Sequence, residues 1–161
     1  MKIINTGGTF NKRYDSRTGK LIVAYDNNAV EEIVDEFAYD VEMAGLLYKD
    51  SLDMTDQDRN ILAQVILQDT EEVFVVIHGT DTMNQSALVL DETLNDRVVV
   101  LVGAMVPFSI DPVEASVNLG MAMGFAASRP QHGIYICMNG IIAPHNRIKK
   151  NKALGEFEVV E

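Results

Sequence analysis

Two uninterrupted apolar runs constrain the fold of this chain more than any other feature of its sequence. Residues 73–77 read VFVVI, and residues 98–102 read VVVLV. A short run without polar alternation is typical of a strand buried on both faces, as in a parallel sheet covered by helices. We therefore expect strands at Glu72–Ile77 and Val98–Val102. Further strands are expected at Met1–Asn5, Tyr39–Tyr48 and Gly133–Met138, with room for one more at Ile141–Ala143.

Segments of helical periodicity separate these strands. Helices are expected over Asn28–Phe37, from Thr55 onward, over about Asp81–Leu94 and over Pro112–Ala127. Asn28 with Glu31, and Thr55 with Asp58, have the three-residue spacing of a capping box. The remaining segment, Phe10–Val23, has turn residues near its middle and is expected to form a hairpin or a mobile loop.

The buried faces of two helices can also be predicted. In the helix after Thr55, Ile61, Leu62, Val65 and Ile66 share one face. In the last helix, the alanines together with Gly120 and Gly124 suggest close packing on the sheet. Because strands and helices alternate, we expect one α/β domain over residues 1–161. Its doubly wound, mostly parallel sheet would form a three-layer structure of the flavodoxin or Rossmann kind.

Charge and composition exclude several classes of function. The formal net charge is −11, which disfavours nucleic-acid binding because binders need clustered lysine and arginine. No apolar run approaches the ~18 residues of a membrane span, and the N-terminal residues lack the apolar core of a secretory signal. A cytoplasmic location follows by elimination. The lone Cys137 lies in an apolar run and is expected to be buried, and no metal site or cofactor is expected.

Turn sequences rich in glycine and threonine follow the expected strands. The first strand is followed by Thr6–Thr9 (TGGT), the central one by His78–Thr82 (HGTDT), and the next by Gly103–Met105 (GAM). The second strand ends near Asp50-Ser51. Because ligands of open parallel sheets bind beyond the carboxyl ends of the strands, we expect these turns to share one edge and one site.

Such turns suit covalent catalysis on a carbonyl group. Glycine backbone N–H groups can stabilise an oxyanion, and an adjacent threonine hydroxyl can act as a nucleophile if a base activates it. Lys150 and Tyr14 are candidate bases. Considered separately, each turn also has a purely structural interpretation. The first could be a tight turn without a catalytic role, and Thr80 or Asp81 could serve only as a helix cap. His78 is expected to be structural. Lys150 itself belongs to a basic cluster, residues 147–152, that could be only a solvated loop.

Taken together, the turns resemble the two signatures of the bacterial-type L-asparaginase/glutaminase family. Residues 6–10 (TGGTF) and 78–83 (HGTDTM) stand in the family's order and spacing. Residues 50–55 (DSLDMT), 102–107 (VGAMVP) and 146–150 (NRIKK) are similar to the substrate-binding segment, the GAM-containing strand end and the lysine-bearing segment. The chain resembles a short, single-domain form of the family's N-terminal catalytic domain.

The resemblance implies a role for each matching residue. Thr9 would be the primary nucleophile on the side-chain amide of L-asparagine, giving aspartate and ammonia through an acyl-enzyme. Thr80, Asp81 and Lys150 match a second triad, and Tyr14 lies where a mobile loop carries an activating tyrosine. The residues expected to bind substrate are Gly8, Asp50, Ser51, Gly79 and Ala104. Ser51 would bind the α-carboxylate, Asp81 the amino group, and backbone near Ala104 the leaving amide.

Two departures from the family pattern bear on the substrate. The family's second, C-terminal domain has no counterpart here, and Leu52 stands where many members place a polar residue that holds the amino group. We expect weaker or looser selection of the amino-acid head group, which leaves other amides open as substrates. A homodimer or tetramer is expected to close the site. The alternatives are a non-catalytic module that binds amides or dicarboxylates, and a domain of a larger amidotransferase assembly.

Overall fold

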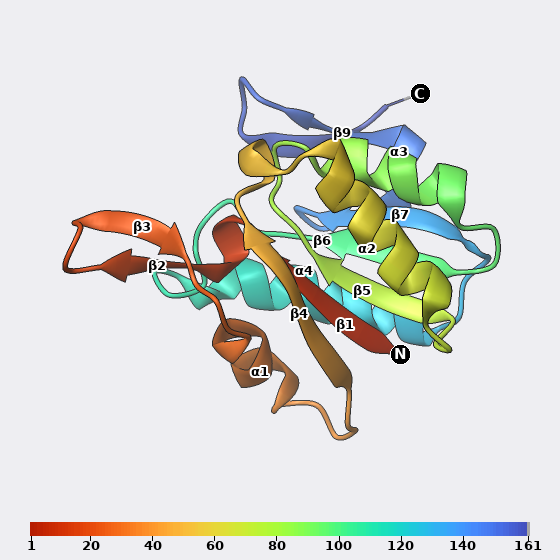
Figure 1. The fold of residues 1–161 in the computed structure, drawn as a ribbon, viewed down its shortest axis with the longest axis horizontal. Helices are drawn as coiled ribbons and strands as arrows, with labels where there is room; N and C mark the ends of the chain where they lie inside the picture. Colours follow the sequence, from red (N-terminus) through yellow and green to blue (C-terminus); the bar gives the residue numbers. More distant parts are fainter. Residues whose placement is uncertain (161) are drawn as a thin grey trace.

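A six-stranded sheet forms the centre of the molecule, in the order β4-β1-β5-β6-β7-β8 (Figure 1). The computed structural model describes residues 1–160. The sheet strands are β1 (Lys2–Gly7), β4 (Glu42–Lys49), β5 (Val73–Ile77), β6 (Val98–Val102), β7 (Gly133–Met138) and β8 (Ile141–Pro144). All neighbouring pairs are parallel except β7 and β8. The predicted doubly wound α/β class is therefore confirmed.

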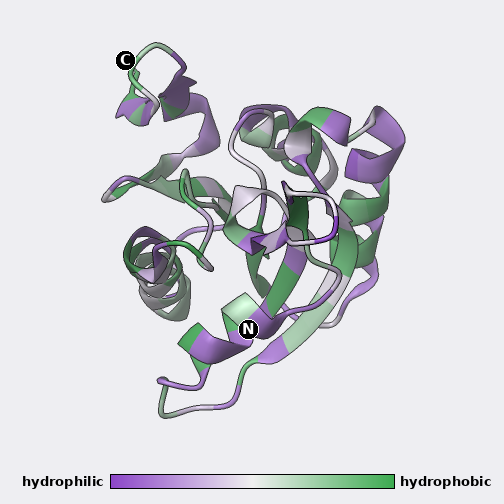
Figure 2. Cartoon of the chain, turned by 90° about the vertical axis from the view of Figure 1, so that its left-hand side faces the viewer, coloured by the Kyte–Doolittle hydropathy of each residue, from purple (hydrophilic) through white to green (hydrophobic). Residues whose placement is uncertain are grey.

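Helices cover both faces of this sheet. On one face lie α1 (Asn28–Val34) and α4 (Pro112–Ala127), and on the other lie α2 (Asp56–Gln68) and α3 (Met83–Thr93). Alternate residues of each strand point to opposite faces of the sheet and pack into two separate hydrophobic cores. Val75 packs with α1 and α4, and Val76 packs with α2 and α3. Figure 2 accordingly shows hydrophobic residues gathered on the central strands. No helix of the described chain is long and apolar enough to cross a membrane.

Two small antiparallel hairpins flank the central sheet. The first, β2 (Lys12–Asp15) with β3 (Lys20–Val23), projects from the body at the left of Figure 1, so the Phe10–Val23 segment is a hairpin. The second joins β9 (Ile148–Asn151) to β10 (Glu156–Val159). Ile148 and Phe157 anchor this second hairpin in the core beside α2 and α3.

One predicted capping box is confirmed and the other is wrong. Thr55 and Asp58 exchange side-chain to backbone hydrogen bonds at the start of α2. Helix α1 instead begins after Asn27, whose side chain makes no capping bond. The Asn27 amide oxygen accepts hydrogen bonds from Asn5 and Tyr48, both at 3.1 Å. Because these tertiary hydrogen bonds occupy the Asn27 side chain, it does not cap α1.

The prediction that Gly120 and Gly124 pack against the sheet is also wrong. A Cβ added at either glycine would meet no heavy atom within 4 Å, so both face away from the sheet. Helix α4 packs through the buried residues Ala115, Leu119, Ala122, Met123 and Ala126. In α2, Leu62 and Ile66 are fully buried, whereas Ile61 and Val65 keep 38% and 36% of their surface exposed. The apolar face of α2 is therefore narrower than its sequence indicates.

Candidate active site

The turns after β1 and β5 touch backbone to backbone. Gly8 has a φ of +73°, a conformation that glycine adopts far more readily than other residues. A Cβ added to Gly8 would lie 2.5 Å from the Cα of Gly79 and 2.9 Å from the carbonyl carbon of His78. Glycine at this position therefore allows the TGGT and HGTDT turns to meet. Thr9 follows directly, half-buried at the start of a short 3-10 helix (Thr9–Asn11).

The end of β4 joins the same pair of turns. Ser51 is buried, and its carbonyl accepts a hydrogen bond of 2.7 Å from the Thr82 hydroxyl. A Cβ on Gly79 would lie 2.6 Å from the Ser51 Cβ, so a second glycine allows a close approach. The structure thus brings Gly8, Ser51 and Gly79 together at the carboxyl ends of the strands.

Lys150 extends from the C-terminal hairpin to the same ends of the strands. Its Nζ donates hydrogen bonds of 2.8 Å to Thr80 Oγ1 and 2.8 Å to Asp81 Oδ1. Thr80 is buried, and the Lys150 side chain is 11% exposed. Because the Lys150 side chain is largely buried, solvent screens its attraction to the Asp81 carboxylate less than it would on the surface. Three residues expected to act together therefore form one hydrogen-bonded group.

Asp50 extends the charged network toward the first hairpin. Burial favours the neutral acid, but a 2.5 Å ion pair with Lys12, a hydrogen bond from the Leu52 amide and the charge of Lys150 together leave the pKa of Asp50 below its usual value. Asp50 therefore remains a carboxylate between two lysines. The sequence did not single out Lys12; its position three residues after Thr9 is the only signal that could have pointed to it.

Ala104 is fully buried behind the turn after β6. The carbonyl of the preceding Gly103 accepts a 3.0 Å hydrogen bond from Asn118, and the Met105 amide donates to Glu114 at 3.0 Å. These bonds fix the backbone on both sides of Ala104. A Cβ on Gly103 would lie 3.2 Å from the Thr80 methyl carbon, so this turn lies against Thr80.

Tyr14 does not join this group. It lies on β2 opposite Leu21 and is 66% exposed. Within residues 1–160, no hydrogen bond connects its hydroxyl to Thr9, Thr80 or Lys150. The projecting hairpin therefore keeps the candidate tyrosine apart from both threonines.

His78 is a structural residue at the end of β5, as expected. It is fully buried, with Nδ1 2.7 Å from the Gly79 carbonyl oxygen and Nε2 2.8 Å from Ser86 Oγ. Burial lowers the pKa of His78 to about 4, the bond to the Gly79 carbonyl opposes this, and the charge of Arg59 adds to it. The imidazole is therefore neutral near pH 7 and ties the HGTDT turn to α3.

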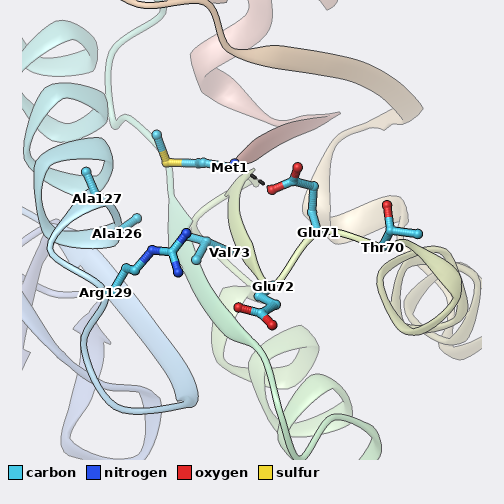
Figure 3. A pocket seen from close by; sticks show the side chains of 8 residues that line it. All are labelled: Met1, Thr70, Glu71, Glu72, Val73, Ala126, Ala127 and Arg129. Carbon is cyan, nitrogen blue, oxygen red and sulfur yellow. Dashed lines mark hydrogen bonds and ion pairs between the residues drawn. The ribbon is translucent and has the colours of Figure 1, made fainter.

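A separate cavity of about 400 Å³ lies at the opposite ends of the strands, beside the starts of β1 and β5 (Figure 3). The N-terminal amine of Met1 forms a 2.6 Å ion pair with Glu71 beside it, and Arg129 completes the rim. None of the candidate residues described above lines this cavity, so it is distinct from the site at the carboxyl ends of the strands.

The parallel sheet, with glycine–threonine turns at the carboxyl ends of its strands, defines an α/β domain of the asparaginase type. The family model "Asparaginase, N-terminal" matches residues 1–157, and the chain therefore belongs to the asparaginase family. It is 33% identical over 159 residues to L-asparaginase 2 of Escherichia coli K12, an alignment that covers 92% of this chain and 45% of that protein.

Other relatives carry different names. A component of the glutamyl-tRNA(Gln) amidotransferase of Methanococcus vannielii is 31% identical over 150 residues, covering 88% of this chain and 34% of that protein. This chain therefore spans less than half the length of the curated relatives it matches. The structure of a probable cytoplasmic L-asparaginase from Campylobacter jejuni matches with a TM-score of 0.81 and 29% identity, over 98% of this chain and 52% of that one. The L-asparaginase of Thermococcus kodakarensis, at 24% identity and a TM-score of 0.85 over 99% of this chain and 51% of that one, shares the fold.

Proposed function

We propose that this domain hydrolyses the side-chain amide of L-asparagine, using Thr9 as the nucleophile. The observation that carries the proposal is the contact of Lys150 with both Thr80 and Asp81, made by residues about seventy positions apart in the sequence. Membership in the asparaginase family supports amide hydrolysis as the class of reaction. The identity of the amide is our inference from the residues around the site.

The reaction would proceed in two balanced steps. The Thr9 hydroxyl oxygen attacks the amide carbon, the carbon–nitrogen bond breaks, and the nitrogen leaves as ammonia with the hydroxyl proton. Water then attacks the resulting ester, the bond to the Thr9 oxygen breaks, and aspartate leaves as the threonine hydroxyl is restored. The Gly8 N–H already donates to the Lys49 carbonyl at 2.8 Å, so of the two turn glycines only Gly79 would offer its backbone N–H to the oxyanion that forms in each step.

Lys150 would act through its charge. Lys150 Nζ donates to Asp81 Oδ1 and to Thr80 Oγ1, each at 2.8 Å, so the same cation contacts both side chains. The positive charge lowers the free energy of a developing negative charge at the Thr80 oxygen or at a water bound there. Thr80 would thus orient the water or assist attack, while Asp81 holds the lysine in place.

The remaining residues would bind the substrate. Ser51 would bind the substrate α-carboxylate through its hydroxyl, and the free oxygen of Asp81 would accept from the amino group. Backbone beside Ala104 would meet the leaving amide. Tyr14 could activate Thr9 only if the first hairpin folds inward, since that residue is 66% exposed in the structure.

Ammonia release from L-asparagine by the purified protein tests the proposal. The Thr9→Ala variant is the control, because it removes the hydroxyl with one methyl group and adds no new side-chain atom to the turn. L-Glutamine, tested in parallel, measures how strictly the side-chain length is selected. Release no greater than that of Thr9→Ala, together with measurable aspartate binding, would instead identify a non-catalytic binding module.

A second candidate function is that of an amidotransferase domain. It is favoured by the 31% identity to a protein named as part of a glutamyl-tRNA(Gln) amidotransferase. Such a domain would pass its ammonia to a partner protein. Co-purification of an endogenous partner that increases amide hydrolysis would support this function, and full activity without any partner would count against it.

We further propose a cytoplasmic homodimer or tetramer in which a second copy helps to close the site. Light scattering at the protein concentration of the assay tests the assembly. A monomer that hydrolyses amide at full rate would contradict it.

A further inference from the structure

A pocket of about 670 Å³ adjoins the candidate active site. It lies between strand β3 of the first hairpin and the end of β4. Its apolar and aromatic walls are formed by Leu21, Ile22, Val23, Tyr25 and Tyr48. Pockets of this volume hold an organic group the size of a drug molecule or part of a peptide. Free asparagine would occupy only a small part of it.

Apolar side chains are exposed around this pocket to an unusual degree. Tyr25 is 81% exposed, Leu21 45% and Ile22 41%, and Tyr25 contacts Tyr48 edge to face at a centroid distance of 6.0 Å. Leu52, 68% exposed, follows the pocket residue Asp50 by two positions. Single exposed apolar residues are ordinary, but a group of them beside a site indicates a surface that binds something.

The pocket lies next to the turns of the candidate site through Lys49 and Asp50, which both line it. The Lys49 carbonyl accepts a 2.8 Å hydrogen bond from the Gly8 amide. Asp50 is followed directly by Ser51, whose Cβ lies 2.6 Å from a Cβ added to Gly79. A substrate whose amide carbon lies at the threonines would therefore extend past Asp50 into the pocket.

Asp50, where the pocket meets the site, already has two partners, which leaves Asp81 as the acceptor for the substrate nitrogen, whether that nitrogen is free or acylated. The two Asp50 oxygens already accept from Lys12 Nζ at 2.5 Å and from the Leu52 amide at 3.1 Å. Leu52 has no polar side-chain atom, and the other carboxylate of the pocket, Asp53, is exposed to solvent. An uncharged, acylated nitrogen avoids the cost of placing a cation beside Lys12 and Leu52.

We propose that this pocket binds an apolar or aromatic acyl group carried on the amino nitrogen of the amide substrate. The substrate class is thus an N-acylated or N-terminally extended asparagine rather than the free amino acid. This inference rests on the proposed amidohydrolase function for its catalytic consequence, but the binding of the acyl group can be measured without turnover.

Binding is measured first, with N-carbobenzoxy-L-aspartate and L-aspartate as probes of the Thr9→Ala protein in calorimetry. We expect the carbobenzoxy compound to bind at least about tenfold more tightly, because its ring is removed from water. Ile22→Glu, which places a charge in the pocket wall, should abolish the difference. Val113→Glu, at an exposed apolar position on α4 (65% exposed, against 41% for Ile22), is the control and should preserve it.

Turnover is measured second, as ammonia release from N-carbobenzoxy-L-asparagine and L-asparagine by the wild-type protein. A higher kcat/KM for the acylated amide, lost in Ile22→Glu and kept in Val113→Glu, would confirm the substrate class. Tight binding of the acylated aspartate without ammonia release would support the pocket while refuting the proposed hydrolase. Equal binding of both probes would overturn the inference. It would also be overturned if Ile22→Glu only dissociated an oligomer and left the preference unchanged, since the surface would then be a contact between copies of the chain.

Discussion

Replacing Gly8 with alanine tests whether the two glycine–threonine turns of the candidate site depend on backbone contact. The new methyl group would lie 2.5 Å from the Gly79 Cα and 2.9 Å from the His78 carbonyl carbon. Backbone atoms cannot rotate away as a side chain can, so one turn must move. Residue 8 must also keep a φ of +73°, which a residue with a Cβ adopts at a cost.

These two costs can be estimated separately. The left-handed conformation costs an alanine about 1–2 kcal/mol, and overpacking against rigid neighbours costs about 1–3 kcal/mol more. The restricted unfolded chain returns about 0.4–1 kcal/mol. We therefore expect Gly8→Ala to lower the free energy of unfolding by about 1–4.5 kcal/mol. A loss of that size should lower Tm by roughly 2–18 °C in a chain of this length.

Two other glycines isolate the contributions. Gly19 has a φ of +68° with nothing within 4 Å of its added Cβ, so Gly19→Ala should cost only about 0.5–1 kcal/mol. Gly120 lies in α4 with open space around it, so Gly120→Ala should stabilise by about 0.5–1 kcal/mol. Urea unfolding followed by circular dichroism measures all three on one scale. If Gly8→Ala costs no more than Gly19→Ala, the close approach of the turns is not the reason for glycine there.

Three further results are expected. Lys150→Met should reduce ammonia release by roughly 10²–10³-fold, because Thr80 and Asp81 lose their shared cation; activity near wild type would refute that role. The folded-state pKa of His78 lies near 4, below its ordinary value of 6.5. The unfolded chain therefore binds the proton first, and up to about 3 kcal/mol of stability should be lost as the pH falls from 6.5 to 4; an NMR titration of the imidazole with a midpoint near 6.5 would contradict this. Burial raises the pKa of Cys137 to about 12, so the native thiol should resist a disulfide reagent at pH 8 and react once urea unfolds the chain.

The fold was largely predictable because the core obeys simple periodicities. The runs VFVVI and VVVLV are buried at every position, as a two-sided parallel sheet requires. Helix α4 begins and ends where Pro112 and Ala127 predicted, since a proline at the first turn and an aspartate cap set its start. Local signals failed where a side chain had a competing partner, as Asn27 does with Asn5 and Tyr48.

The site was predictable only in part. The glycine–threonine turns follow from the strand ends, but the hairpin that contains the basic segment 147–152 was not predicted. Its β9–β10 hairpin aligns Lys150 with Phe157, and burial of Phe157 fixes which face Lys150 occupies. The alternation of Ile148, Lys150 and the later Phe157 around a turn ending in Gly155 was the available signal. The ion pair between Lys12 and Asp50 depends on tertiary contact, which no local pattern records.

The C-terminal hairpin also sets when the proposed site can first exist. Lys150 is held in position by β10, whose Phe157 side chain is buried and whose Phe157 amide donates to Asn139 at 2.9 Å. A chain emerging from the ribosome carries Thr9 and Thr80 long before it carries the strand that positions the lysine. Thr80 therefore lacks its contact with Lys150 until this hairpin has formed, and the proposed chemistry can begin only once residue 157 has been made and has packed.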